Sequence, residues 1–200
     1  LSIFIFVSLY ISNNKINKFT IDKSNCILSI FLIWIVLILM GTIPLYVIFP
    51  KENAKDIFFL TVTLVTTNGI WTDIDYISNP AFIVWKSVLQ WTGGLCTIIV
   101  GSFFVEMVLS KKNISKDHFS LENLRIIFFV YLFITIIFTL VFKLLLKDWN
   151  EALQVSMALL STSNAFNSSG DIMVEFNIIT KIFMIFLMLI GSLSINLHYK

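Results

Sequence analysis

The sequence is poor in charged residues, which make up 13% of its 200 residues. Soluble domains carry roughly a quarter charged residues, so water alone is not the expected solvent of this chain. The two cysteines, Cys26 and Cys96, lie at or inside apolar segments far apart, and their spacing predicts neither a disulfide framework nor a metal site. The sequence has no nucleophile elbow, no paired histidine ligands and no phosphate-binding glycine loop. It therefore predicts neither an enzyme nor a bound cofactor.

Long apolar segments are what the chain has instead. Four of them are long enough, or nearly so, to cross about 30 Å of hydrocarbon as helices; they are Cys26–Phe49, Pro80–Val105, Ile126–Phe142 and Phe176–Leu197. Leu1–Ile11 resembles the end of a further span, and a chain that begins with Leu rather than Met is open to being read as a fragment. No basic region precedes that stretch and no small-residue cleavage site follows it, which argues against a signal peptide. The sequence predicts an integral, multi-pass membrane protein.

Charged residues differ between the two sets of connections. One set, which includes Lys111, Lys112 and Arg125, has an excess of basic residues and is predicted to face the cytoplasm. The opposite set includes Asp73 and Asp75 and is mildly acidic. An acidic outer surface suits a protein that meets cations.

Two apolar stretches, Ala54–Val65 and Asn150–Leu160, are too short to cross the membrane. Each begins on the predicted outer side and must return to it, because the following long span has to run from outside to inside. We therefore predict two re-entrant segments. The polar run TTNG that follows the first one would form the break at the bottom of a hairpin. Non-helical backbone is tolerated at that depth only where protein or a water-filled cavity covers it.

A shift of 95 residues superposes the second half of the chain on the first without a gap. It pairs Asp56 with Glu151, Thr67 with Thr162, Ile83 with Ile178 and Lys86 with Lys181. The same shift places Asn164 at the position of Gly69, where a tight turn needs left-handed dihedral angles that glycine adopts freely and asparagine tolerates best among the rest. An alternative second tip at Ser168, Ser169 and Gly170 would require an insertion.

Hydroxyls and backbone carbonyls at the two tips are neutral oxygen ligands of the kind that can replace the hydration shell of a monovalent cation. The C-terminal end of each short helix, with its partial negative charge, would point to the same place. No carboxylate lies at either tip, which argues against a divalent-ion site. The alternative is a helix-packing motif of small residues.

The sequence also makes predictions for three residues of the second long span. Gly93 and Gly94 predict close packing against the re-entrant segment, with a hinge as the alternative. Lys86, like Lys181, is expected to extend its ammonium group to the outer interface. A role in tuning the mouth of an ion path is the alternative for both lysines.

The chain resembles the TrkH/KtrB (TrkG) family of potassium transporters. The stretches that carry the resemblance are WIVLILMGTIPLYV, DIFFLTVTLVTTNGI and VWKSVLQWTGGLCTIIV in the first half, then NEALQVSMALLSTSNAF and IFMIFLMLIGSLSINLHY in the second. It covers about residues 27–200. The resemblance implies tandem repeats of transmembrane helix, re-entrant pore helix with filter loop, and transmembrane helix. The expected organisation is the end of a preceding helix with a basic linker (1–25), a first repeat (26–110), a cytoplasmic loop (111–125) and a second repeat (126–200).

The resemblance further implies passage of potassium, and often sodium, across a bacterial inner membrane. Carried over by position, the potassium-binding residues are Thr66, Thr67, Asn68, Gly69 and Ile70, then Ser161, Thr162, Ser163, Asn164 and Ala165. The family usually works with a cytosolic nucleotide-binding subunit (TrkA/KtrA-like), for which the loop 111–125 is a candidate contact. Lipid is the other expected partner, and no nucleic acid is expected.

Two departures from the family stand out. This chain has two repeats where the family has four, and Asn164 and Asn68 replace a glycine and a threonine of the family pattern. A homodimer or a separately encoded second half would complete four pore loops. The alternative is a non-conducting membrane scaffold or a degenerate fragment of such a transporter.

Overall fold

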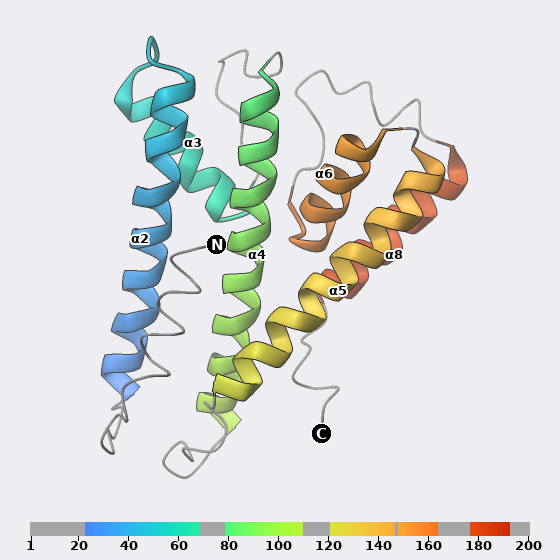
Figure 1. Ribbon diagram of the computed structural model, residues 1–200. Helices are drawn as coiled ribbons and strands as arrows, with labels where there is room; N and C mark the ends of the chain where they lie inside the picture. The colour runs from blue at the N-terminus through green and yellow to red at the C-terminus, as the bar shows by residue number, and fades with distance from the viewer. Residues whose placement is uncertain (1–22, 69–78, 110–120, 147, 164–176, 193–200) are drawn as a thin grey trace. The chain divides into compact units, whose positions relative to one another are not determined.

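The computed structural model describes residues 23–68, 79–109, 121–146, 148–163 and 177–192. Its helices (Figure 1) are α2 (Lys23–Ile48), α3 (Ala54–Val65), α4 (Pro80–Leu109), α5 (Leu121–Leu145), α6 (Trp149–Leu160) and α8 (Ile178–Ser192). No strand occurs within these ranges. The prediction of an all-helical chain is confirmed.

Within the described ranges, three helices are long and apolar enough to cross a membrane, through the segments Phe31–Ile48, Pro80–Gly101 and Arg125–Leu145. Helix α8 is equally apolar but has only 15 described residues. Large apolar side chains are exposed along α2, α5 and α8, among them Leu144 at 88%. Soluble proteins rarely expose apolar patches of this extent, so these faces suit hydrocarbon.

Local sequence accounts for where the helices begin. Pro80 is the first residue of α4, a position where the missing N–H is not needed. The side-chain oxygen of Asn79 accepts a hydrogen bond from the N–H of Ala81 at 3.0 Å, which satisfies one of the free donors of the first turn. Helix α3 begins after Asn53, whose amide donates to the carboxylate of Asp56 at 3.2 Å.

The order of long helix, short helix and long helix occurs twice, as α2–α3–α4 and as α5–α6–α8. A shift of 95 residues relates α3 to α6 at both ends, as the sequence predicted. The preceding helices end at Ile48 and Leu145, which is a shift of 97, and the following ones begin at Pro80 and Ile178, which is a shift of 98. The connections before and after the short helices therefore differ in length between the two halves.

The alignment without gaps is thus wrong for α4 and α8. With a shift of 98, Phe82 corresponds to Thr180, Lys86 to Met184 and Leu89 to Leu187, and all six side chains are buried. With a shift of 95, buried Phe82 would instead correspond to Asn177, which is exposed. The partner of Lys86 is Met184, and the pairing of Lys86 with Lys181 is a coincidence of residue type.

The expectation that Lys86 reaches the outer interface is also wrong. Its side chain is 3% exposed and lies on the same face of α4 as Phe82 and Gly93, which is the face that packs against α3. Lys181, three positions from the equivalent place in α8, is half-buried.

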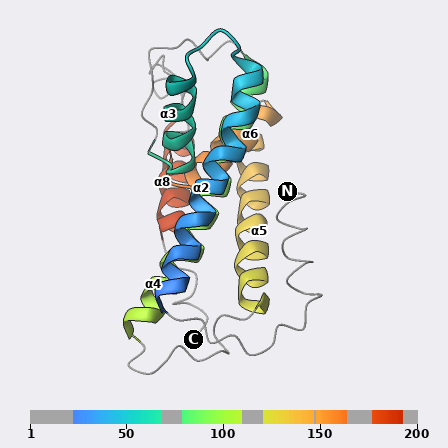
Figure 2. The same ribbon diagram turned by 90° about the vertical axis from the view of Figure 1, so that its left-hand side faces the viewer.

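Buried side chains form two clusters that share α4. One contains Leu45 of α2, Ile57 of α3 and Phe82 of α4; the other contains Trp91 of α4 with residues of α5, α6 and α8. Helix α4 is in contact with both α3 and α6, which lie beside it in Figures 1 and 2. Helix α4 therefore joins the two repeats.

Candidate functional site

The first short helix ends in a hydrogen-bonded turn. The N–H of Asn68 donates to the carbonyl of Thr63 at 3.0 Å, and the N–H of Thr67 donates to the carbonyl of Leu64 at 3.1 Å. These two bonds define a Schellman motif, in which the residue after the helix cap is left-handed. Thr67 takes that conformation, with φ of 57°.

The second short helix ends in the same turn 95 residues later. The N–H of Ser163 donates to the carbonyl of Ala158 at 2.9 Å, and the N–H of Thr162 donates to the carbonyl of Leu159 at 3.0 Å. Thr162 is left-handed as well, with φ of 53°. The two tips are therefore equivalent in backbone conformation as well as in sequence position.

Threonine is an unusual residue for this position. Glycine is the usual choice, because a branched Cβ crowds the backbone when φ is positive. Strain of this kind costs about 1–3 kcal/mol per residue and persists where the surrounding structure enforces it. The sequence predicts left-handed dihedral angles at Gly69 and Asn164, which lie outside the described residues. Within the described ranges, Thr67 and Thr162 are the non-glycine residues with positive φ.

Hydroxyl groups at the tips donate their protons back to the helices. Thr66 Oγ1 donates to the carbonyl of Val62 at 2.7 Å, and Ser161 Oγ donates to the carbonyl of Ala158 at 2.9 Å. Ser163 Oγ lies 2.9 Å from Ser161 Oγ. A hydroxyl whose proton is engaged in this way keeps acceptor lone pairs for another partner, which is what a cation ligand requires.

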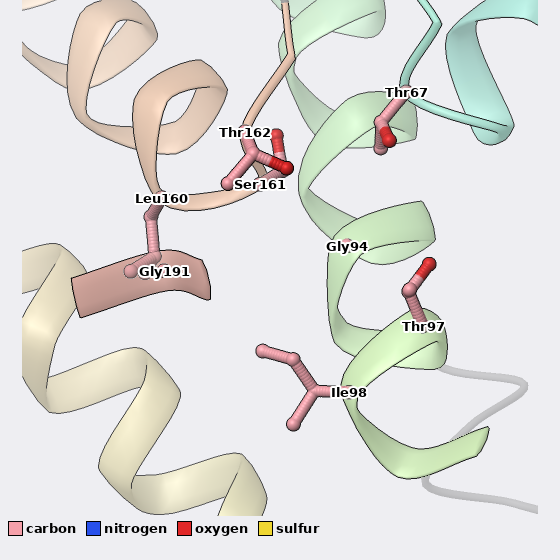
Figure 3. Close-up of a pocket in the computed structure, with 8 residues that line it drawn as sticks. All are labelled: Thr67, Gly94, Thr97, Ile98, Leu160, Ser161, Thr162 and Gly191. Carbon is pink, nitrogen blue, oxygen red and sulfur yellow. The ribbon is translucent and has the colours of Figure 1, made fainter. Parts of the chain in front are cut away.

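A small cavity of about 50 Å³ lies between the two tips and α4 (Figure 3). It is lined by Thr67, Ser161 and Thr162 of the tips, by Gly94, Thr97 and Ile98 of α4, and by Leu160 and Gly191. None of these eight side chains is charged. The volume leaves room for a water-sized particle.

Thr97 is a further residue of the site that the sequence did not predict. It adds a hydroxyl to the cavity, one helical turn after Gly93, and that hydroxyl donates to the carbonyl of Gly93 at 3.0 Å. The sequence signal that could have identified it is a polar residue four positions after the first glycine of the GG pair, on the same face of α4.

Glycines bring the long helices against the ends of the short ones. A Cβ on Gly93 would lie 2.0 Å from the carbonyl oxygen of Val65, and a Cβ on Gly191 would lie 2.3 Å from that of Leu160. Val65 and Leu160 are the last residues of α3 and α6, and Gly93 and Gly191 are related by the shift of 98. Close packing of Gly93 against the short helix is confirmed, and the second repeat has the same contact.

Gly94 makes a different contact, which links the two repeats. A Cβ there would lie 2.5 Å from Cβ of Ser161 and 2.8 Å from Oη of Tyr131. Trp91, one turn earlier, donates from Nε1 to Thr135 Oγ1 at 3.0 Å, and its ring centroid lies 5.2 Å from that of Tyr131. Buried residues of α4 and α5 therefore pack together beside Ser161 of the second tip.

The charges of the site lie at the far ends of the short helices. Asp56 and Glu151 stand in the first turns of α3 and α6, where an acid interacts favourably with the positive end of the helix dipole. Desolvation raises the pKa of the Glu151 carboxyl, and nearby Asp148 raises this pKa further. The negative ends of both dipoles are at the tips.

The structure brings together Thr67, Ser161 and Thr162 of the predicted site and places Thr66, Asn68 and Ser163 beside them. The remaining predicted residues lie outside the described ranges; they are Gly69, Ile70, Asn164, Ala165, Ser168, Ser169 and Gly170. Comparison with protein-family models, with curated proteins and with solved structures gives no match to this chain.

Proposed function

We propose that this chain is a subunit of a transporter for potassium or a similar monovalent cation, and that its two tips form part of the ion path. The observation that carries the proposal is the pair of identical Schellman turns. Each has a strained threonine, and both open on one small cavity whose lining combines the hydroxyl-bearing residues Thr67, Thr97, Ser161 and Thr162 with apolar residues and has no charged side chain.

The ligand chemistry favours a monovalent ion. Neutral hydroxyl and carbonyl oxygens can replace the hydration shell of such an ion without holding it too tightly to leave. A divalent ion would call for carboxylates, and none lines this cavity. The C-terminal ends of α3 and α6 carry partial negative charges, and both ends lead into the tips that line this cavity.

The membrane arrangement follows from helix length. Each short helix has 12 residues, and such a helix is about 18 Å long, well short of about 30 Å of hydrocarbon. We infer that α3 and α6 enter from the outer side of a bacterial inner membrane and turn back at their tips. Gly93 and Gly191 allow α4 and α8 to pack directly against the last residues of α3 and α6, Val65 and Leu160, which are buried, as broken backbone at membrane depth requires.

Two tips alone surround only one side of an ion. The resemblance to a four-repeat family leads us to propose that a second copy, or a separately encoded second half, supplies two further tips. A cytosolic nucleotide-binding subunit is the proposed gate.

Replacing each strained threonine by valine tests the proposal, because Thr67→Val and Thr162→Val remove a hydroxyl while keeping the branched shape. The chain is reconstituted in liposomes and uptake of rubidium, a potassium analogue, is measured. We expect several-fold slower uptake for both variants. Thr139→Val is the matched control, because that hydroxyl donates to a carbonyl within α5, away from the tips.

Transport by the unaltered chain that neither variant slows would contradict the assigned ion path. A correctly inserted chain that transports no rubidium, either alone or when a candidate second half is reconstituted with it, would instead support a membrane scaffold.

A further inference from the structure

We propose that two copies of this chain close into a ring in which α8 of each copy packs against α2 and the α3 tip of the other. This is the contact that α4 makes with α5 and the α6 tip within one chain. The function of such a ring rests on the proposed ion path. The contact itself is inferred from the burial of side chains, and cross-linking tests it independently of transport.

One stripe of α4 forms the contact between the repeats. It consists of Ser87, Gln90, Trp91 and Gly94, whose spacing places them on one face of the helix. All four are buried. Trp91 donates to Thr135 of α5, and Gly94 lies against Ser161 of the second tip.

The equivalent stripe of α8 is uncovered in the described part of the chain. The shift of 98 gives Ile185, Met188, Leu189 and Ser192, and the first three are 60%, 40% and 58% exposed. Ser192 is exposed too. Elsewhere the two helices agree closely, since Phe82, Lys86 and Leu89 and their counterparts are all buried. The difference between α4 and α8 is concentrated on this one stripe.

The first tip shows the complementary difference. Residues 54–58 of α3 and 149–153 of α6 have the same pattern of burial, position by position. At the tips the pattern diverges, because Thr66 and Asn68 are exposed where Ser161 and Ser163 are 4% and 5% exposed.

The preceding helices diverge in the same way. In α5, Tyr131 and Thr135 contact Trp91 of α4 and are buried. At the shift of 97 their counterparts in α2 are Trp34 and Ile38, which are only half-buried.

The described part of the chain thus contains one complete repeat-to-repeat contact and the two unmatched halves of another. A contact between two different surfaces of the same molecule builds a ring when its rotation closes, and a ring of two such chains contains four tips. Lipid suits Leu189, whereas Thr66 and Asn68 beside the broken backbone need protein or a water-filled cavity against them; a ring of two copies would supply both.

The residue types across the proposed contact also correspond. The hydrogen-bonded pair Trp91 and Thr135 becomes the apolar pair Leu189 and Ile38, so that both partners change together and no polar group is left alone. Ser192 of α8 corresponds to Gly94 of α4. Because serine has a Cβ that glycine lacks, α8 of one copy must lie slightly farther from Thr66 of the other copy than α4 lies from Ser161.

Disulfide cross-linking in membranes tests this contact. In chains whose Cys26 and Cys96 are replaced by alanine, Thr66→Cys carries one tag and Ser192→Cys carries another, and the two are co-expressed and oxidised. The internal contact places the equivalent Cβ atoms close together, so the wider spacing set by Ser192 falls in the range that a disulfide bridges. We expect a covalent species that contains both tags.

The control pair is Val47→Cys with Ile182→Cys. These side chains are 77% and 59% exposed, and their counterparts Leu144 and Val84 are exposed as well, at 88% and 55%. Repeat symmetry therefore places them against lipid, and we expect no cross-link.

Absence of the Thr66–Ser192 cross-link, although both thiols react with a membrane-permeant maleimide, would overturn the proposed ring. An equally strong cross-link in the control pair would overturn it too. A specific cross-link in a chain that moves no rubidium would retain the ring and reject the transport proposal. Transport without the cross-link would reject the ring and retain the transport proposal.

Discussion

Gly93→Ala is the most direct perturbation of the contact between α4 and the first tip. The added Cβ would lie 2.0 Å from the carbonyl oxygen of Val65, and the other near atoms, at 2.9 and 3.2 Å, are also backbone atoms of Val65. A side chain could rotate out of the way, but a backbone carbonyl at the end of a helix cannot. The helices must therefore separate by roughly 1 Å before the contact becomes tolerable.

Two opposing terms set the magnitude. Over-packing of this kind costs about 1–3 kcal/mol, while alanine in place of glycine inside a helix recovers up to about 1 kcal/mol. We expect Gly93→Ala to lower the free energy of unfolding by roughly 1–2 kcal/mol. Thr67 lies two residues after Val65, so the same displacement moves the tip and should slow rubidium uptake.

Gly101→Ala provides the matched control in the same helix. Apart from its chain neighbours and the backbone of its own helix, no atom lies within 4 Å of the position that its Cβ would take, so this variant should only gain helix propensity, by up to about 1 kcal/mol. Unfolding by sodium dodecyl sulfate in mixed micelles, followed by circular dichroism, compares the two variants. If both unfold at the same detergent fraction, the assigned contact between Gly93 and Val65 is incorrect.

Three further predictions concern the second repeat and the tips. Gly191→Ala should destabilise the chain by an amount similar to Gly93→Ala, because its Cβ would lie 2.3 Å from a backbone oxygen, and the same unfolding assay measures it. Thr135→Val leaves the buried Nε1 of Trp91 without its acceptor and should cost about 1–3 kcal/mol; an unchanged unfolding midpoint would refute that hydrogen bond. Gly69→Ala should reduce rubidium uptake without reducing membrane insertion, since a Cβ is added to the predicted filter turn, and equal uptake per inserted chain would contradict the prediction.

Helix positions were largely predictable because apolar run lengths determine them. The limits of α3 match the predicted segment, and α6 differs from its prediction by one residue, Trp149. The correspondence of α4 with α8 was mispredicted because Lys86 and Lys181 happen to align when no gap is allowed. In an apolar sequence, identities carry little information about register. Burial locates the register instead, through pairs such as Leu89 and Leu187.

Composition predicts where the tips lie, but the usual residue preferences at positive φ do not predict which residues are left-handed there. Glycine and asparagine are the expected residues at positive φ, which directed attention to Gly69 and Asn164 rather than to Thr67 and Thr162. The burial of Lys86 was missed for a related reason. Its environment is set by α3, which is far away in sequence, and a charged residue near a helix end is ordinarily expected to reach water.

The two strained threonines are the strongest internal evidence that the tips have a role beyond ending a helix. From the last turn of the short helix to the tip, the sequence LVTTN (64–68) in one half aligns with LLSTS (159–163) in the other. The two segments share the leucine and the left-handed threonine. Glycine would close the same Schellman turn without strain. A position selected only for stability would therefore be expected to lose its branched side chain in at least one of the two repeats. Both repeats have it, and both threonines line the same cavity, so the Thr67→Val and Thr162→Val variants test directly whether these hydroxyls act on an ion there.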